Sequence, residues 1–330
     1  GTIQAMSSWL RQSMQVFIYG VGAWLTLRGQ ATPGCMIAAS IIMGRALQPV
    51  QMGIGSWKNM IEARSAWARI KQTLADIEQR ASMDLPVPKG QLKIEHVSLS
   101  LNLKNILKDL NLSLEAGESL GIIGPSGAGK SSLCRLLLGV WVPTAGVVRL
   151  DGANIFDWES EKLGPHIGYL PQDLELFSGT VAENIARLGV VDSEQVVEAA
   201  KQAGVHEMIL GFPSGYDTRV GEAGLVLSGG QRQRIGLARA LYGQPCMIVL
   251  DEPNSNLDEA GEKAMLKSWS GLKQRDATLI VVSHKQALLS GVDKILMLVN
   301  GQIAMYGPRD AVFKKIMEVK KQQPARSVNG

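Results

Sequence analysis

The chain has 330 residues, of which 45% are hydrophobic and 19% charged, and its formal net charge is +4. This length accommodates two domains, and the sequence has no basic stripe interleaved with aromatic residues, which argues against a nucleic-acid-binding protein. Cys35, Cys134 and Cys246 make neither a disulfide framework nor a metal-ligand spacing, so we expect a reduced, cytosolic setting for the main domain. Because the chain begins with Gly1 rather than Met, we also expect it to be a fragment that lacks an N-terminal part.

Two apolar segments near the N-terminus predict a helical hairpin. Residues 12–27 carry no charge, and a polar turn at 29–34 separates them from a second apolar segment at 35–57. We interpret the pair as membrane spans, although the first, at about 16 residues, falls short of the roughly 20 that a bilayer needs. The alternative is two buried helices of a soluble helical domain. If the second segment spans a membrane, Arg45 within it would face a bundle interior or a water-filled path, or it would lie near a headgroup if the helix is tilted.

A change of pattern marks the end of this region. Residues 58–80 predict a charged amphipathic helix that continues the second span into the cytoplasm. Two prolines and a glycine within residues 84–90 indicate a linker. We therefore divide the chain into a membrane fragment (residues 1–83), a linker (84–90), a second domain (91–321) and a disordered polar tail (322–330).

The second domain predicts strands that alternate with helices. Residues 92–99 and 110–114 alternate in hydropathy, and residues 119–123, 167–170, 247–250 and 279–282 form short apolar runs that are typical of buried parallel strands. Asp151-Gly152 and Asn300-Gly301 are hairpin-turn signals, the first of them after a strand at 147–150. Helical spacing between these runs favours an α/β fold with a mainly parallel sheet.

One glycine-rich turn in this domain predicts phosphate binding. It fits the pattern G-x-x-x-x-G-K-[ST] and lies between an apolar strand and a helix. Glycines let the backbone wrap closely round a phosphate, Lys130 should reach the outer phosphates, and the Ser131 hydroxyl should ligate Mg²⁺. The alternative is a Gly-rich turn that binds nothing. The candidate residues are Gly124, Pro125, Ser126, Gly127, Ala128, Gly129, Lys130, Ser131 and Ser132.

A second motif supplies acidic groups. The apolar strand at 247–250 ends in Asp251 and Glu252. Asp251 should hold Mg²⁺, and Glu252 should orient and deprotonate an attacking water. The alternative is that adjacent acids merely end a strand.

A third motif suggests a second anion site. In Leu227-Ser-Gly-Gly-Gln231, Ser228 is a helix N-cap, and the helix is expected to continue through Leu241. Gly229 and Gly230 would expose backbone N–H groups to a phosphate. Together with the phosphate-binding loop and the Gln-Arg-Gln-Arg sequence that follows, this segment resembles the signature of the ATP-binding-cassette (ABC) family. The resemblance implies that Ser228, Gly229, Gly230 and Gln231 close over ATP held by a second copy of the chain.

Further positions match the family. Gln172 matches the glutamine that links the Mg²⁺ and water site to the membrane domain, and His284 the switch histidine that contacts the γ-phosphate. Gly221-Glu222 resembles an exporter-specific contact with membrane-domain loops. Residues 255–258 match the segment that connects the two ATP sites, which makes Asp258 a candidate nucleotide contact. One departure is Leu101, at a position where the family usually places an aromatic side chain on adenine, so we expect weak discrimination between bases.

The N-terminal region narrows the resemblance to one branch. Residues 34–50 and 55–58, and the segment 251–258, resemble the type I secretion ATPases that export proteases, lipases and haem-carrier proteins. The resemblance implies an ABC nucleotide-binding domain with a helical signature subdomain, preceded by part of an all-α exporter transmembrane domain. It also implies an ATPase that uses ATP and Mg²⁺ as a homodimer in the bacterial inner membrane, with its ATP-binding domain in the cytoplasm.

The partners implied are a periplasmic membrane-fusion protein, an outer-membrane channel and a protein cargo with a C-terminal secretion signal. Three alternatives stay open on the sequence. The first is an exporter of lipids, drugs or peptides. The second is a soluble ABC ATPase of DNA repair or chromosome organisation, which lacks support because no long coiled-coil insertion separates Lys130 from Ser228. The third is a regulatory cassette that does not hydrolyse ATP, which the presence of Glu252 and His284 disfavours.

Overall fold

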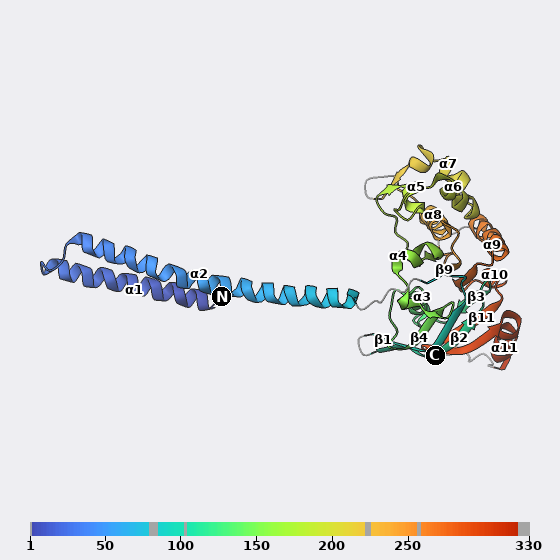
Figure 1. Cartoon of the computed structure of the whole chain (residues 1–330), viewed down its shortest axis with the longest axis horizontal. Coiled ribbons are helices and arrows are strands. Elements are labelled where there is room, and N and C mark those ends of the chain that lie inside the picture. The colour runs from blue at the N-terminus through green and yellow to red at the C-terminus, as the bar shows by residue number, and fades with distance from the viewer. Residues whose placement is uncertain (1, 79–84, 102–103, 222–225, 256–258, 323–330) are drawn as a thin grey trace, which may run out of the picture. The chain divides into compact units, whose positions relative to one another are not determined.

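The computed structural model describes residues 2–78, 85–101, 104–221, 226–255 and 259–322. The chain forms two compact units, Gly1–Arg80 and Ala81–Gly330 (Figure 1). The predicted Asp258 contact, Glu222 and most of the predicted tail at 322–330 lie outside the described residues.

The first unit is the predicted helical hairpin. Helix α1 (Thr2–Leu27) and helix α2 (Pro33–Glu78) are joined by a short turn and pack against each other. A methyl group on Gly22 would lie 2.7 Å from Cγ of Met36, so glycine permits the close approach of the two helices. Helix α2 continues in one piece to Glu78, as the sequence predicted for the amphipathic extension. By length and hydropathy, none of the helices within the described residues qualifies as a membrane span.

The second unit is built on a six-stranded sheet in the order β12-β11-β3-β10-β9-β6. All neighbouring pairs are parallel except β11 and β12, which form a hairpin through Asn300 and Gly301. The predicted parallel sheet and this hairpin turn are confirmed. The strands are β3 (Ser119–Ile123), β6 (Ile167–Leu170), β9 (Met247–Asp251), β10 (Thr278–Val282), β11 (Lys294–Val299) and β12 (Gln302–Pro308).

Both faces of this sheet are buried, which explains the continuous apolar runs. Along β9, Met247 and Val249 face one hydrophobic cluster, whereas Ile248 and Leu250 face the other. Residues of β10 divide between the clusters in the same alternating way. The sheet thus separates two cores and carries its polar residues at its ends.

A four-stranded sheet in the order β2-β1-β4-β5 covers one end of the unit, and β7 pairs with β8. The turn at Asp151-Gly152 connects β4 and β5, as predicted. Strand β2 begins at Lys104, six residues earlier than the pattern from residue 110 suggested, because a β-bulge near Asp109, at φ 46°, interrupts the alternation. The strands are β1 (Leu92–Leu101), β2 (Lys104–Leu114), β4 (Ala145–Leu150), β5 (Ala153–Asn154), β7 (Gly179–Thr180) and β8 (Arg219–Val220).

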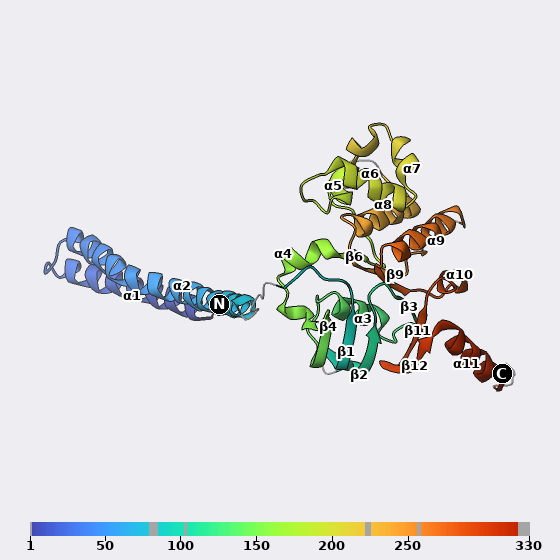
Figure 2. The same ribbon diagram turned by 45° about the vertical axis from the view of Figure 1, so that its right-hand side comes forward.

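Helices α5, α6 and α7 gather at the end of the unit opposite to β1, β2 and β4 (Figure 2). Helix α8 lies between them and the parallel sheet, with contacts to α5, α6 and β6. The helices of this unit are α3 (Lys130–Leu137), α4 (Ser160–Leu163), α5 (Val181–Ile185), α6 (Ser193–Gln202), α7 (His206–Leu210), α8 (Gly229–Leu241), α9 (Glu259–Gln274), α10 (Gln286–Leu289) and α11 (Arg309–Gln322).

The start of the second unit is fixed by one carboxylate. Residues 85–90, the described part of the predicted linker, have no regular secondary structure. Asp151 accepts hydrogen bonds from the backbone N–H groups of Lys89, Gly90 and Gln91, at 2.6, 3.2 and 3.0 Å. The turn after β4 therefore anchors the chain where it enters the first strand.

Candidate functional site

The glycine-rich turn lies between β3 and α3, at the carboxyl end of a central parallel strand. Gly124 has φ 154°, and a Cβ there would lie 2.1 Å from the carbonyl oxygen of Leu298. Gly129 has φ 100° and precedes the first turn of α3. The Lys130 side chain is buried, and its Nζ donates to the carbonyl oxygens of Gly124 (2.8 Å) and Pro125 (3.0 Å). The loop therefore surrounds an ammonium group beside a helix N-terminus, which is an arrangement suited to anions.

Asp251 is the last residue of β9 and is only 2% exposed. Burial raises the pKa of its carboxyl group, and the neighbouring Glu252 charge adds to this effect. A hydrogen bond with the Ser131 side chain and the charge of Lys130 act in the opposite direction. Ser131 at the start of α3 and Asp251 at the end of β9 thus meet at one edge of the sheet.

The donor set at this edge fits Mg²⁺. Among the described residues, Asp251 Oδ1 is buried without a hydrogen-bond partner. A carboxylate and a hydroxyl are the hard oxygen ligands that Mg²⁺ prefers, and this ion commonly keeps waters and substrate phosphates as its other ligands. In the described part of the chain, no group of three or more His, Cys, Asp and Glu side chains could hold a metal. Ser131 and Asp251 thus suit a metal that arrives with a nucleotide.

Two predicted residues, Gln172 and His284, approach the Glu252 carboxylate, although all three are far apart in the sequence. Glu252 has φ 50°, and its backbone N–H donates to the carbonyl oxygen of Val282 at 3.0 Å. Gln172 Nε2 donates to Glu252 Oε2 at 3.0 Å, and His284 Nε2 lies 3.6 Å from Glu252 Oε1. A short left-handed turn after β9 therefore aims the carboxylate between the ends of β6 and β10, where the other two residues stand.

The predicted N-cap and helix limits around Ser228 are confirmed. Helix α8 runs from Gly229 to Leu241, and Ser228 is its N-cap. The Ser228 hydroxyl accepts from the backbone N–H of Gln231 at 3.2 Å, and the Gln231 side chain accepts from the Ser228 N–H at 2.8 Å. This reciprocal capping box fixes the first turn, whose amides point along the helix axis and can meet an anion.

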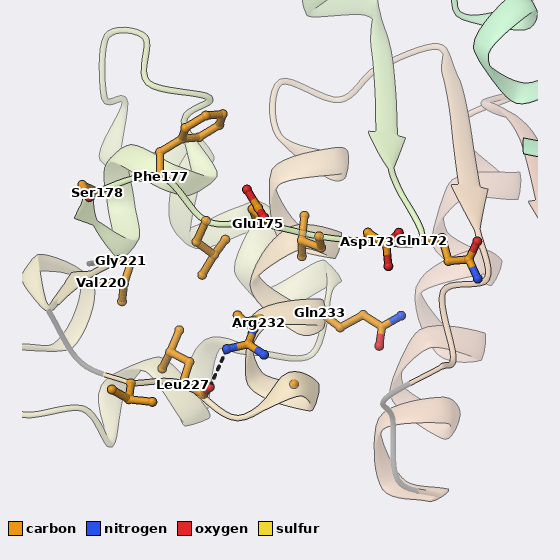
Figure 3. Close-up of a pocket in the computed structure, with 14 residues that line it drawn as sticks. Gln172, Asp173, Glu175, Phe177, Ser178, Val220, Gly221, Leu227, Arg232 and Gln233 are labelled. Carbon is orange, nitrogen blue, oxygen red and sulfur yellow. Dashed lines mark hydrogen bonds between the residues drawn. The ribbon is translucent and has the colours of Figure 1, made fainter. Parts of the chain in front are cut away.

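A groove of about 790 Å³ separates residues 172–178 from the start of α8 (Figure 3). Its lining includes Gln172, Phe177, Gly221 and Arg232. Phe177 is 57% exposed, and Arg232 donates to the carbonyl oxygen of Leu227 at 3.0 Å. The groove thus joins the residues next to Glu252 to those next to Ser228, and it offers an exposed aromatic side chain at its rim.

The sequence did not predict the contacts of other polar side chains at the site. Gln233, 3% exposed, donates from Nε2 to the Glu252 carbonyl oxygen and to Ser255 Oγ, both at 3.2 Å. The Ser283 hydroxyl, next to His284, donates to Asn254 Oδ1 at 3.2 Å. Gln233 lies in the Gln-Arg-Gln-Arg sequence, but nothing in that pattern indicates which of its polar residues turns inward.

Leu101, at the predicted base-contact position, is the last residue of β1 and is 40% exposed. An exposed leucine at a strand end offers an apolar surface without the stacking that an aromatic ring provides.

Together, the fold and the site define a P-loop nucleotide-binding domain, with a phosphate-binding loop, a buried carboxylate and a polar triad at adjacent strand ends. Residues 107–255 match the family model described as "ABC transporter", and the domain they form is an ABC nucleotide-binding domain, the ATPase domain of this family.

Related proteins extend the likeness beyond this domain. The chain is 44% identical over 317 residues to the type I secretion system ATP-binding protein PrsD of Rhizobium meliloti. The alignment covers 95% of this chain and 54% of that protein. It is 36% identical over 308 residues to a putative multidrug export ATP-binding/permease protein of Staphylococcus aureus, with coverage of 91% and 53%. The chain therefore spans about half the length of the curated relatives it matches.

A solved structure also resembles the whole chain. The structure of a bacterial Atm1-family ABC exporter with ATP bound superposes with a TM-score of 0.73 at 27% sequence identity. The match covers 99% of this chain and 59% of that one. The helical hairpin and the nucleotide-binding domain thus both have counterparts in an ABC exporter, as the sequence predicted.

Proposed function

We propose that this chain is the ATP-hydrolysing component of a type I secretion system and exports a protein substrate. The observation that carries the ATPase assignment is the convergence of Gln172 and His284 on Glu252, beside the buried Asp251. The 44% identity to a type I secretion ATP-binding protein over 95% of the chain supports the secretion branch.

In this proposal, the chain's own residues supply positioning and charge, because phosphoryl transfer requires little covalent chemistry from the protein. Lys130 and the loop amides hold the phosphates. Ser131 and Asp251, with Gln172 nearby, would hold Mg²⁺, which would supply positive charge to the phosphate oxygens. Glu252 orients the attacking water and accepts its proton, and His284 and Gln172 keep the carboxylate in place.

We propose that a second copy completes the site. Ser228, Gly229, Gly230 and Gln231 begin a helix whose N-terminus suits a phosphate, yet the phosphate-binding loop belongs to a different strand-helix unit. A twofold dimer would place this turn of one copy over ATP held by the other, as the family resemblance implies.

The helical unit supports a location in the bacterial inner membrane. Its exposed side chains include Trp9, Val16, Phe17 and Leu27, which are between 67% and 89% exposed. An exposed apolar surface of this kind needs cover, and we propose lipid and the remaining spans of the exporter. The groove between Gln172 and Gly221 would receive loops of that membrane domain. A membrane-fusion protein and an outer-membrane channel would complete the export path.

The test compares two stimulants of ATP hydrolysis in lipid-reconstituted protein. A peptide with a C-terminal secretion signal should raise phosphate release, and small amphiphilic drugs should not. The 36% identity to a putative multidrug exporter makes drug export the second candidate, which the opposite pattern of stimulation would favour. A protein that releases no phosphate under any of these conditions would refute both.

A further inference from the structure

A short segment that begins at Gln172 lies across helix α8. We call residues 172–178 the Gln172 segment. Leu174 packs on α8 at Gly236, where a Cβ would lie 2.1 Å from Leu174 Cδ2. A larger residue at this position would force the Leu174 side chain to move, so glycine suits this approach although it is a poor helix former. The first contact between the segment and the helix is thus a close apolar one.

Asn184 of α5 binds the backbone at the far end of this segment. Its side chain is completely buried. Its Nδ2 donates to the carbonyl oxygens of Phe177 and Thr180, both at 2.9 Å, and its Oδ1 accepts from the N–H of Phe177, also at 2.9 Å. A buried amide with every group bonded fixes the backbone around it, since each lost bond would leave a buried polar group unpaired.

Arg239, in the last turn of α8, connects Asn184 and the Gln172 segment to the helix. Its Nη2 donates to Asn184 Oδ1 at 2.6 Å, and its Nε donates to the Asn184 carbonyl oxygen at 2.9 Å. Its Nη1 donates to the carbonyl oxygen of Glu175 at 3.2 Å, and its guanidinium lies 5.3 Å from the centre of the Phe177 ring. Burial lowers the pKa of Arg239, and the nearby Arg187 charge acts in the same direction. The group thus sits in a site that is unfavourable for charge, held by carbonyl and amide oxygens.

We propose that Arg239 and Asn184 are positioning residues that lock the Gln172 segment onto α8. Gln172, at one end of the segment, contacts Glu252, and Ser228, at the other end of α8, would cap the ATP of the partner copy. An α-helix is stiff, and Ser228 and Arg239 lie roughly 16 Å apart along it. The lock therefore keeps the two halves of the ATP site in a fixed relation. This inference rests on the proposed function and assigns it two residues outside the motifs.

The chain offers a matched control in Arg187. It is also a partly buried arginine, and it donates to the carbonyl oxygens of Gly164, Ile167, Arg239, Ala240 and Tyr242. Its bonds tie the end of α8 to the start of β6, and none of them reaches the Gln172 segment. A role in stability alone predicts the same behaviour for Arg187→Lys and Arg239→Lys, because lysine retains the charge and loses the guanidinium fork in both.

The experiment measures kcat and KM for ATP in the wild-type chain and in both variants, each normalised to its folded fraction. We expect Arg239→Lys to lower kcat on the order of tenfold or more, because small misplacements of catalytic groups are costly, and to leave KM within about twofold. Arg187→Lys should retain the wild-type kcat. Equal kcat values in the two variants would overturn the proposal.

A readout that needs no turnover separates this inference from the proposed function. Hydrogen exchange at residues 173–178 and 229–232 should become faster in Arg239→Lys, and in Arg187→Lys it should stay at the wild-type rate. Faster exchange confined to the neighbours of residue 239 would contradict the proposal even if the wild-type chain hydrolysed no ATP.

Gly236→Ala serves if Arg239→Lys does not fold. It improves helix propensity and displaces Leu174 from α8. The lock predicts a lowered kcat for Gly236→Ala, and an unchanged kcat together with unchanged exchange in the Gln172 segment would count against it.

Discussion

Replacing Glu252 with glutamine isolates one role within the site. The substitution retains the side-chain volume and removes one charge. In the folded chain this carboxylate accepts from Gln172 at 3.0 Å and faces His284 at 3.6 Å. Its charge also helps to raise the pKa of Asp251, so its removal makes Asp251 easier to ionise. We therefore expect Glu252→Gln to bind ATP and Mg²⁺ at least as tightly as the wild-type chain.

The expected loss lies in the chemical step. A general base contributes roughly 10²- to 10⁴-fold to a rate. At about 1.4 kcal/mol for each factor of ten, the barrier should rise by about 3–5 kcal/mol. Phosphate release measures the rate, and binding of a fluorescent ATP analogue measures the affinity. Near-normal turnover would refute the role of Glu252, and lost ATP binding would refute the separation of its role from that of Asp251.

Glu118→Gln is the control for this variant. Glu118 pairs with Lys294 at 2.6 Å, and its side chain is 28% exposed, close to the 27% of Glu252. It lies outside the site, so the control should turn over ATP at the wild-type rate. A similar loss in both variants would point to a general effect of removing a carboxylate.

Three further variants test other features. Burial raises the pKa of Asp251, so the ionised carboxylate destabilises the fold as pH rises through that pKa. Asp251→Asn should therefore raise the unfolding temperature at neutral pH by a few degrees, and it should abolish Mg²⁺-dependent phosphate release. Leu101→Tyr should lower the KM for ATP about tenfold through base stacking, whereas a wild-type chain that already prefers ATP strongly over GTP would show that another residue reads the base. Burial alone would raise the pKa of Asp293, but hydrogen bonds from Lys273 and Ser119 hold this pKa below its usual range. The stability that the Asp293 carboxylate contributes should therefore disappear as pH falls through the lowered pKa. Asp293→Asn should flatten the dependence of the unfolding temperature on acid pH, and an unchanged dependence would contradict this.

The sequence predicted most of the parallel sheet, because strands buried on both faces produce unbroken apolar runs. Strand β2 was predicted too short, because the bulge near Asp109 breaks the alternation on which such predictions depend. The limits of α8 followed from Ser228 and Gln231, whose side chains bond to each other's backbone. The capping residues thus predicted the limits of helix α8 more reliably than hydropathy predicted the limits of strand β2.

Some residues of the site could likewise be predicted from the sequence, and others could not. Glu252 was predicted from the acidic end of an apolar strand, and Gln172 and His284 were identified by resemblance. The parallel order of β6, β9 and β10 explains why the three residues meet. Asn184 and Arg239 were not found, because their importance depends on which backbone groups they reach after folding. A buried asparagine in a short helix has no sequence pattern that distinguishes it from a solvent-exposed one.

Complementation between two inactive variants tests the central claim most directly. Lys130→Ala removes the phosphate-binding ammonium group, and Ser228→Arg blocks the helix that would close over the partner's ATP. Each variant alone should be inactive. In an equal mixture, a twofold dimer has one intact site in half of its molecules, so turnover should recover to about a quarter of the wild-type rate. Full turnover by Ser228→Arg alone, or no recovery in mixtures shown to form mixed dimers, would contradict the account.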